Sequence, residues 1–191
     1  MKTQTIIAIR FLLAMTILTG IIYPFFMTGV AQLIFPSKAN GSLITKNGKI
    51  VGSELIGQKF DSSIYFWSRP SAIDYNPMPS GASNLGPTSE KLKEQVKERR
   101  LLFASSNTIA DTSVIPTEML FASASGLDPH ISPEAALLQL NRVAMARNLS
   151  DAQIQQVMQL IKNKTKGLQF FRFGDPRINV FELNLALDSI K

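Results

Sequence analysis

Hydrophobic positions are distributed unevenly along the chain. One uncharged run lies between Arg10 and Lys38, and no later segment approaches its length. A helix that crosses the hydrocarbon core of a bilayer needs about 20 apolar residues. The pattern therefore predicts a transmembrane helix over residues 11–31. A short tail over residues 1–10 precedes this helix, and a single soluble domain over residues 32–191 follows it.

A cleaved signal peptide is the alternative explanation of this run. Basic residues precede it, and the sequence "GVA" before Gln32 resembles a weak cleavage site. The apolar region of a signal peptide usually spans about 7–15 residues, which is shorter than the run in this chain. The membrane helix is therefore preferred. Pro24 lies inside it, and proline is tolerated in membrane helices.

Charge counting does not settle the orientation of this helix. Lys2 and Arg10 precede the run, whereas Lys38, Lys46 and Lys49 follow it. Arg10 lies directly against the apolar residues behind a short tail, which favours an amino terminus on the cytoplasmic side. Long domains are translocated largely regardless of their charge, so the rest of the chain is predicted to lie outside.

After the run, short segments predict strands and loops. Residues 41–52 predict a hairpin around Asn47 and Gly48, a pair that readily adopts the positive φ angles of a tight turn. Residues 64–87 begin with the pattern of a strand. They then become rich in proline, glycine, serine and asparagine, which predicts a loop.

Helix signals follow this loop. One helix is predicted from about Ser89, with apolar positions spaced along one face. Ser132 is a good N-cap for a second helix, and Pro133 fits the first helical position, where no amide donor is needed. The second helix is predicted to continue to about Arg147. It is predicted to bury three residues, namely Leu137, Leu140 and Ala144.

A third helix and a mixed tail complete the pattern. The sequence "SDAQ" at residues 150–153 has the form of a capping box. Apolar residues at the spacing of one buried helix face follow it: Ile154, Val157, Met158 and Ile161. Gly167 is predicted to end this helix. Two strands are predicted around residues 174–176 and a helical pattern over residues 180–187. Locally paired strands between about three helices indicate an α+β fold.

Composition narrows the chemistry. The net charge of +6 is modest, and the densest basic segment, residues 91–100, also carries glutamates. No aromatic platform accompanies it, so nucleic-acid binding is not predicted. With one histidine and no cysteine, zinc sites built from several histidines or thiolates are excluded, and no metal site is predicted. A chain without cysteine fits either redox compartment.

The signatures of ATP hydrolysis are also absent from the sequence. Gly48 and Lys49 are followed by Ile50, without a glycine five positions earlier, so they do not form a Walker loop. The sequence "NKTKG" at residues 163–167 resembles the phosphorylation sequence of P-type pumps. Asn163, however, is an amide and cannot accept a phosphoryl group as an aspartate does. No catalytic residue is therefore predicted.

His130 is the one candidate for a catalytic base. It precedes the N-cap and proline of a predicted helix, and the chain has no "GxSxG" nucleophile motif. The helix start therefore explains this residue without catalysis. Two loops rich in small residues, at 80–87 and 123–130, would let backbone amides approach an anion. Loops of this kind are also common as plain turns.

Several segments carry a family resemblance. In chain order they are "TGIIYPFF", "ANGSL", "GSELIGQKF", "YFWSRPSA", "SGASNLGP", "SASGLDPHISPEAA", "RVAMARNL" and "INVFELNLALD". With these segments the sequence resembles the C subunit (KdpC) of the Kdp potassium-transporting P-type ATPase. Each segment alone is unspecific, whereas the ordered set, from Gly20 to Asp188, is specific.

The resemblance implies a non-catalytic accessory subunit of an ATP-driven, high-affinity potassium import complex. Such a subunit has one membrane helix and a soluble domain on the outer, periplasmic side of the cell inner membrane. The implied partners are the channel-like A subunit that translocates potassium, the ATP-hydrolysing B subunit and a small F peptide. Family members are described as aiding assembly or as raising the ATP affinity of the pump, the "catalytic chaperone" idea. No tightly bound cofactor is implied.

An outer domain conflicts with direct contact to cytoplasmic ATP. The candidate nucleotide-binding residues are Ser123, Ser125, Gly126 and Gln139. We expect the two loops to serve instead as partner or structural surfaces, with these candidates: Arg69, Ser80, Gly81, Asn84, Gly86, Asp128 and His130. The membrane helix is expected to pack through Gly20, Pro24 and Gly29, since small residues permit close helix approach.

Two other functions stay open at this point. One is a membrane-anchored extracytoplasmic hydrolase that uses His130 as its base. The other is an anchored module that binds an unrelated small ligand. A hydrolase would show turnover that His130→Ala abolishes, whereas an accessory subunit would keep the activity of its complex after the same substitution.

Overall fold

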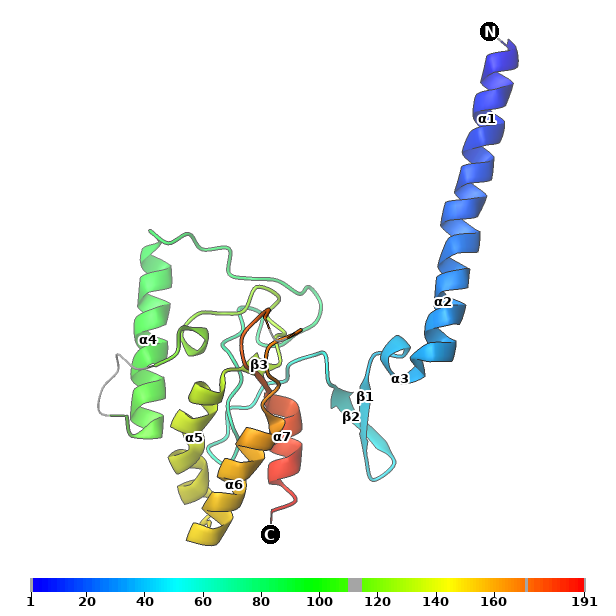
Figure 1. The fold of residues 1–191 in the computed structure, drawn as a ribbon. Coiled ribbons are helices and arrows are strands. Elements are labelled where there is room, and N and C mark those ends of the chain that lie inside the picture. Colours follow the sequence, from blue (N-terminus) through cyan, green and yellow to red (C-terminus); the bar gives the residue numbers. More distant parts are fainter. Residues whose placement is uncertain (1, 110–114, 171, 191) are drawn as a thin grey trace. The chain divides into compact units, whose positions relative to one another are not determined.

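The structure is a computed structural model that describes residues 2–109, 115–170 and 172–190. The chain divides into two compact units, Met1–Ser53 and Glu54–Lys191. Figure 1 shows the order of the helices and strands along the chain. The predicted α+β class is confirmed, with a long apolar helix at the amino terminus and several helices and short strand pairs after it.

The first unit begins with one long helix in three parts. α1 (Lys2–Ile17) continues through a π-helical turn, η1 (Leu18–Ile22), into α2 (Tyr23–Ile34). None of its described side chains is buried, and the segment is long and apolar enough to cross a membrane. Two threonine hydroxyls, Thr19 and Thr28, donate to the carbonyls four residues earlier at 2.7 and 2.8 Å. Their polar hydrogens are therefore satisfied within the helix.

The proline ring of Pro24 explains the π-helical turn η1. Pro24 has no amide hydrogen, and in a regular α-helix its ring would clash with the carbonyl oxygen of Gly20. A wider turn just before the proline moves this carbonyl away from the ring. Single π-turns of this kind are the usual form in which π-helix occurs inside α-helices.

A hairpin completes the first unit. The short helix α3 (Pro36–Ala39) leads into strands β1 (Leu43–Lys46) and β2 (Lys49–Ser53), which pair antiparallel. Asn47 and Gly48 form the turn with φ angles of 53° and 76°. The predicted hairpin and its turn residues are thus confirmed.

The described residues of the second unit form four α-helices, each of which packs against the next in chain order. They are α4 (Glu90–Asn107), α5 (Pro133–Ala146), α6 (Asp151–Lys164) and α7 (Val180–Leu187). α5 contacts both α4 and α6, and α6 also contacts α7. In Figure 1 these last three helices lie together, with α4 (green) beside α5. The predicted helices are confirmed, although α6 ends three residues before Gly167.

Capping side chains define where these helices begin. Ser132 Oγ accepts a hydrogen bond from the amide of Ala135 at 3.0 Å, which confirms the predicted N-cap of α5. The side chain of Gln153 accepts from the amide of Ser150 at 2.8 Å and closes the predicted capping box of α6. Asn179 Oδ1 accepts from the amide of Glu182 at 3.1 Å and caps α7 as Ser132 caps α5. Each cap satisfies an amide that the first turn of a helix leaves without a partner.

The core of the second unit lies between these helices and the chain segment around Phe66. Its fully buried apolar members are Phe66, Leu120, Ile131, Ala135, Ala136, Val143, Val157, Ile178, Val180, Leu183 and Leu187. The predicted burial of Leu137 is wrong, since 47% of this residue is exposed, and Met158 is 40% exposed. On α5 the buried face includes the polar residues Gln139 and Arg142. The predicted burial of Leu140 and Ala144 is confirmed. A pattern that counts only apolar residues therefore finds part of this face but misses its polar members.

The small sheet of the second unit differs from the expected one. β3 (His130–Ile131) pairs antiparallel with β4 (Ile178–Asn179), so its two strands are far apart in the chain. Instead of two strands around residues 174–176, the tail makes isolated bridges, one of which joins Lys166 and Arg177. Local alternation predicted a local hairpin, but the buried partner of Ile178 is the segment that leads into α5.

The strand predicted at residue 64 is also absent as a paired strand. The peptide groups of Phe66 are held by Asn184, with both distances at 2.9 Å. Those of Trp67 are held by Gln139, at 2.6 and 3.3 Å. Side-chain amides from α7 and α5 thus take the place of neighbouring strands. Alternation in the sequence does not distinguish these two ways of satisfying a backbone.

Candidate functional site

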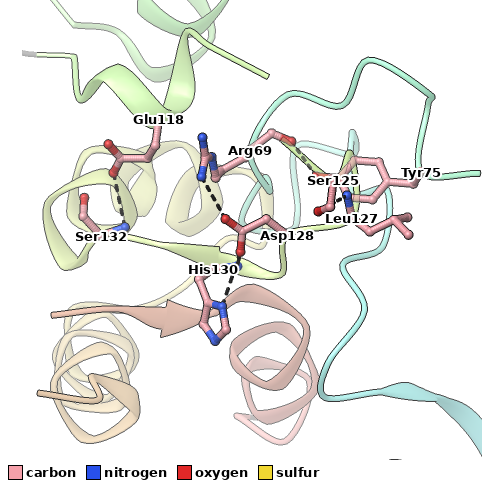
Figure 2. Close-up of polar contacts among 8 residues, drawn as sticks. All are labelled: Arg69, Tyr75, Glu118, Ser125, Leu127, Asp128, His130 and Ser132. Carbon is pink, nitrogen blue, oxygen red and sulfur yellow. Dashed lines mark hydrogen bonds and ion pairs between the residues drawn. The ribbon is translucent and has the colours of Figure 1, made fainter. Parts of the chain in front are cut away.

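Two loops predicted as binding or structural surfaces meet in the second unit. We call their contact, made by residues 69–87 and 123–130, the loop junction. Two backbone hydrogen bonds join them, from Ser123 to the carbonyl of Pro70 at 3.1 Å and from Gly81 to the carbonyl of Ser125 at 3.0 Å. Figure 2 shows the side chains that converge there. The structure therefore brings together segments that are about 50 residues apart in the chain.

Gly126 permits the close approach of these loops. Its φ angle is +70°, in the left-handed region that favours glycine. A Cβ at this position would lie 2.4 Å from Cγ1 of Ile73 and 2.9 Å from the carbonyl oxygen of Gly81. A glycine is therefore required on both conformational and steric grounds.

Arg69, Asp128 and His130 form the polar centre of the loop junction. Arg69 Nη1 donates to Asp128 Oδ2 at 2.8 Å. Asp128 Oδ1 accepts the backbone amide of His130 at 3.0 Å and lies 3.3 Å from its Nδ1. In Figure 2 Asp128 lies between the other two side chains. One carboxylate thus links the first loop to the residues that lead into α5.

Opposing effects set the pKa of Asp128. Burial raises the pKa of this carboxyl, but the hydrogen bonds from the side chain and amide of His130 and from Arg69 lower it further than burial raises it. The net result is a pKa below the ordinary value of 3.8. The carboxylate is therefore ionised at neutral pH and holds its charge pair with Arg69.

Arg69 itself is held at both ends. The hydroxyl of Tyr75 donates to its backbone carbonyl, and burial raises the pKa of that phenol to about 12. The Nε of Arg69 is buried without a hydrogen-bond acceptor among the described residues. An unsatisfied donor of this kind costs about 1–3 kcal/mol. The rest of the loop junction holds the guanidinium in place against this cost.

The arrangement around His130 orients its ring but supplies no nucleophile from the described residues. Asp128 at Nδ1 would hold the ring as an acid–base group requires. The nearest serine in the chain, Ser132, uses its Oγ to cap α5 and its amide to donate to Glu118 at 3.2 Å. No hydrogen bond joins the ring to a hydroxyl in the described parts of the chain. The contacts instead fix the start of α5.

The other predicted residues of the first loop come later in the chain than Arg69. Ser80, Asn84 and Gly86 are exposed along the first loop, whereas Gly81 bonds the second loop. Asn84 adopts a φ of 52°, a conformation that asparagine tolerates. These residues are therefore the exposed part of the first loop within the loop junction.

The four candidate nucleotide residues do not gather in one site. Ser123 and Ser125 line a hollow of about 520 Å³ in the second loop. Gln139 is fully buried elsewhere, with its amide bonded to Trp67 and Arg142. Nucleotide binding stays a prediction, and in this conformation Gln139 is not available for it.

Sequence reasoning missed one buried polar group of the second unit, the side chain of Arg142 in α5. The guanidinium of Arg142 donates to Gln139 at 2.8 Å, to Asn107 at 3.0 Å and to the carbonyls of Ser63 and Tyr65 at 2.7 and 3.0 Å. Burial lowers its pKa to about 10. The spacing of Gln139 and Arg142 on one helix face was the available signal, but polar residues three apart usually indicate a solvated face.

Metal binding finds no support in the arrangement of acidic and histidine side chains. Over the described ranges, no cluster of three or more such groups has the arrangement of a metal site. Asp128 and His130, the closest such pair in the loop junction, are already engaged with each other and with Arg69.

Comparisons with known proteins agree over nearly the whole chain. A family model described as "K+-transporting ATPase, c chain" matches residues 5–189. Similar proteins named "Potassium-transporting ATPase KdpC subunit" come from Methylococcus capsulatus, with 48% identity and 96% of each chain covered, and from Burkholderia ambifaria, with 50% identity and 99% and 97% covered. A third, from Dechloromonas aromatica, is 46% identical, with 100% and 99% covered. The chain therefore belongs to the KdpC family, the c chain of K+-transporting ATPases.

Proposed function

We propose that this chain is a membrane-anchored, non-catalytic accessory subunit of a high-affinity potassium import complex. The observation that carries the proposal is the family match over residues 5–189, which spans both compact units. In this role the chain works with a channel-like A subunit, an ATP-hydrolysing B subunit and a small F peptide. Potassium is the ion that the whole complex transports.

The long helix supplies the anchor. The segment Lys2–Ile34 exposes an apolar surface that a bilayer stabilises and water does not. Its amino terminus lies in the cytoplasm and the second unit outside the inner membrane, an orientation supported by Arg10 next to the apolar residues. Gly20 and Gly29 have open space beside them, which leaves room for a neighbouring helix.

The second unit stabilises the complex from the outer side. The loop junction supports this role, because its backbone bonds and the Arg69–Asp128 pair hold exposed loop residues such as Ser80 in defined positions. A raised ATP affinity of the pump then results from stabilising one arrangement of the subunits, since ATP is on the opposite side of the membrane. Direct nucleotide contact would have to use residues 123–126.

Co-purification in mild detergent tests the proposal. We expect this chain to be recovered with larger multi-spanning subunits and with potassium-stimulated ATPase activity. Ser80→Arg should reduce this recovery, whereas Gln155→Arg, which adds the same side chain to an exposed position of α6, should not. Recovery of the chain alone under conditions that preserve the other subunits would overturn the proposal.

Single-cysteine labelling tests the orientation. The chain has no cysteine, so a label attaches only at the introduced residue. Thr3→Cys reports the location of the amino terminus, and Gln155→Cys reports that of the second unit. A membrane-impermeant maleimide added to spheroplasts should label Gln155→Cys at once and Thr3→Cys only after permeabilisation. The reverse order would contradict the orientation but not the membership of the complex.

The hydrolase alternative makes a different prediction for His130. If the chain is an accessory subunit, His130→Ala leaves most of the ATPase activity of the assembled complex in place. If it is a hydrolase, the purified chain alone turns over a substrate and His130→Ala abolishes this turnover. Assaying both preparations of the variant separates the two functions.

A further inference from the structure

The second unit also contains a cavity, which the start of the loop junction helps to line. Its volume is about 470 Å³, within the range of about 300–1,000 Å³ typical of small-molecule sites. The start of the first loop, α4 and the turn at Met119 form its wall. Four aromatic residues contribute to the wall: Phe60, Trp67, Tyr75 and Phe103. The cavity is therefore predominantly apolar, with an aromatic lining.

One cation of this wall has no ion-pair partner among the described residues. Arg99, from α4, donates Nη1 to the carbonyl of Leu120 at 2.9 Å. No described carboxylate lies in a salt bridge with it. Burial lowers the pKa of its guanidinium, although the adjacent Glu98 acts in the opposite direction. A half-buried cation without a counter-ion is unfavourable, and an anion in the cavity would offset this.

The other cations of the wall are already neutralised. Arg69 pairs with Asp128 at 2.8 Å, and Lys59 pairs with Asp74 at 2.8 Å. Asp61 is a further acidic residue of the wall, and Asp74 is already paired with Lys59. A ligand with several negative charges would place some of them near these carboxylates without a cation of their own, whereas a ligand with one charge needs Arg99 alone.

The aromatic part of the wall is held in place before any ligand binds. The guanidinium of Arg142 stacks on the ring of Trp67, 4.2 Å from its centroid. The indole Nε1 donates to the carbonyl of Ser62 at 3.0 Å, and Gln139 holds the backbone of the same residue. A fixed aromatic surface loses little freedom on binding, which favours affinity.

We propose that this cavity binds a small apolar molecule with a single negative charge, of the aryl or alkyl monocarboxylate class. Its carboxylate pairs with Arg99, and its apolar body lies against Trp67 and Phe103. Guanidinium and carboxylate groups pair through two parallel hydrogen bonds, which gives direction as well as attraction. The inference does not depend on the proposed function, because it concerns a cavity within one compact unit.

Tryptophan emission can report binding, because Trp67 lines the cavity and is the single tryptophan of the chain. The full-length protein in detergent micelles is titrated with 3-phenylpropionate while tryptophan emission is followed. We expect a saturable change. The neutral isostere 3-phenylpropanol should bind at least about tenfold more weakly, as expected when a charge-assisted pair is lost.

Variants at position 99 identify the anion partner. Arg99→Gln should weaken 3-phenylpropionate binding at least about tenfold, and Arg99→Lys, which keeps the charge, should fall between Arg99→Gln and the wild type. Arg100→Gln is the matched control, because Arg100 does not line the cavity, and it should bind like the wild type. An unchanged emission spectrum of each ligand-free variant shows that it is folded.

Three results would overturn the inference. One is the absence of a saturable change with 3-phenylpropionate. Another is equal affinity for the acid and the alcohol, since Arg99 would then have no part in binding. The third is ATP binding that is tighter than that of the monocarboxylate and is weakened by Arg99→Gln, because the wall carboxylates would then not exclude a polyanion from this cavity.

Discussion

Gln139 and Trp67 are joined through both polar atoms of one side chain and both backbone groups of one residue. The Trp67 amide donates to Gln139 Oε1 at 2.6 Å, and Gln139 Nε2 donates back to the Trp67 carbonyl at 3.3 Å. Asn184 holds Phe66 in the same way. Two successive residues of one segment are therefore held by two different helices, Trp67 by α5 and Phe66 by α7.

Replacing Gln139 should destabilise the second unit. Gln139→Leu leaves the amide and carbonyl of Trp67 without partners and removes an acceptor of Arg142. We expect a loss of about 2–4 kcal/mol in the free energy of unfolding. Urea unfolding of the full chain in micelles, followed by tryptophan emission, measures this value. The exposed control Gln155→Leu should change it by less than about 0.5 kcal/mol. Equal losses in the two variants would show that the hydrogen bonds between Gln139 and Trp67 do not stabilise the fold.

The Asp128 carboxylate should make stability depend on acid pH. Its pKa in the folded state lies below the ordinary 3.8, so its contribution is complete above that value and is lost as pH falls through the folded pKa. Asp128→Asn should therefore reduce the drop in melting temperature between about pH 5 and pH 2. Arg69→Gln removes one cause of the lowered pKa and should shift this drop towards higher pH. An unchanged acid profile in both variants would contradict the assignment.

The Tyr75 phenol should ionise at a higher pH than an exposed tyrosine. Burial raises its pKa to about 12, and the chain has three tyrosines to compare. An absorbance titration of the folded protein should show one phenol ionising near pH 12, and Tyr75→Phe should remove that step. Because the raised pKa favours the neutral form, Tyr75 contributes stability below pH 10 and loses that contribution as the pH rises towards 12.

A methyl group at Gly126 should disrupt the loop junction. Gly126→Ala places a Cβ 2.4 Å from Ile73 Cγ1 at a φ of +70°. We expect a loss of about 1–3 kcal/mol in the free energy of unfolding. Gly167→Ala is the matched control, because its Cβ would meet no atom within 4 Å. The melting temperatures of the two variants measure this difference. A loss of stability no larger for Gly126→Ala than for Gly167→Ala would argue against the close approach of the two loops at Gly126.

The parts of the fold that could be predicted depend on neighbouring residues. Asn47 and Gly48 specify their own turn, and Ser132 caps the helix that starts at the next residue. Because cause and effect lie within a few positions, the sequence shows both. The same is true of the long apolar helix, because the uncharged run that makes it long and apolar enough to cross a membrane is visible in the sequence itself.

The parts that could not be predicted depend on distant partners. Arg69 and Asp128 are 59 residues apart, and Phe66 and Asn184 are 118 apart. Nothing near Asn184 indicates that its amide replaces a neighbouring strand. The burial of Arg142 was hidden in a similar way, since its partners come from three different segments. The loops of the candidate site were therefore identified, but their mutual contacts were not.

The wide turn before Pro24 has a consequence for the positions that flank it. Because η1 holds more residues per revolution than the helix on either side, α2 is rotated about its axis relative to a uniform helix. A neighbouring membrane segment that follows one stripe of α1 will meet different residues on α2 than a helical wheel suggests. Substitution scanning should therefore reveal a regular periodicity in each half, with a break in phase between them.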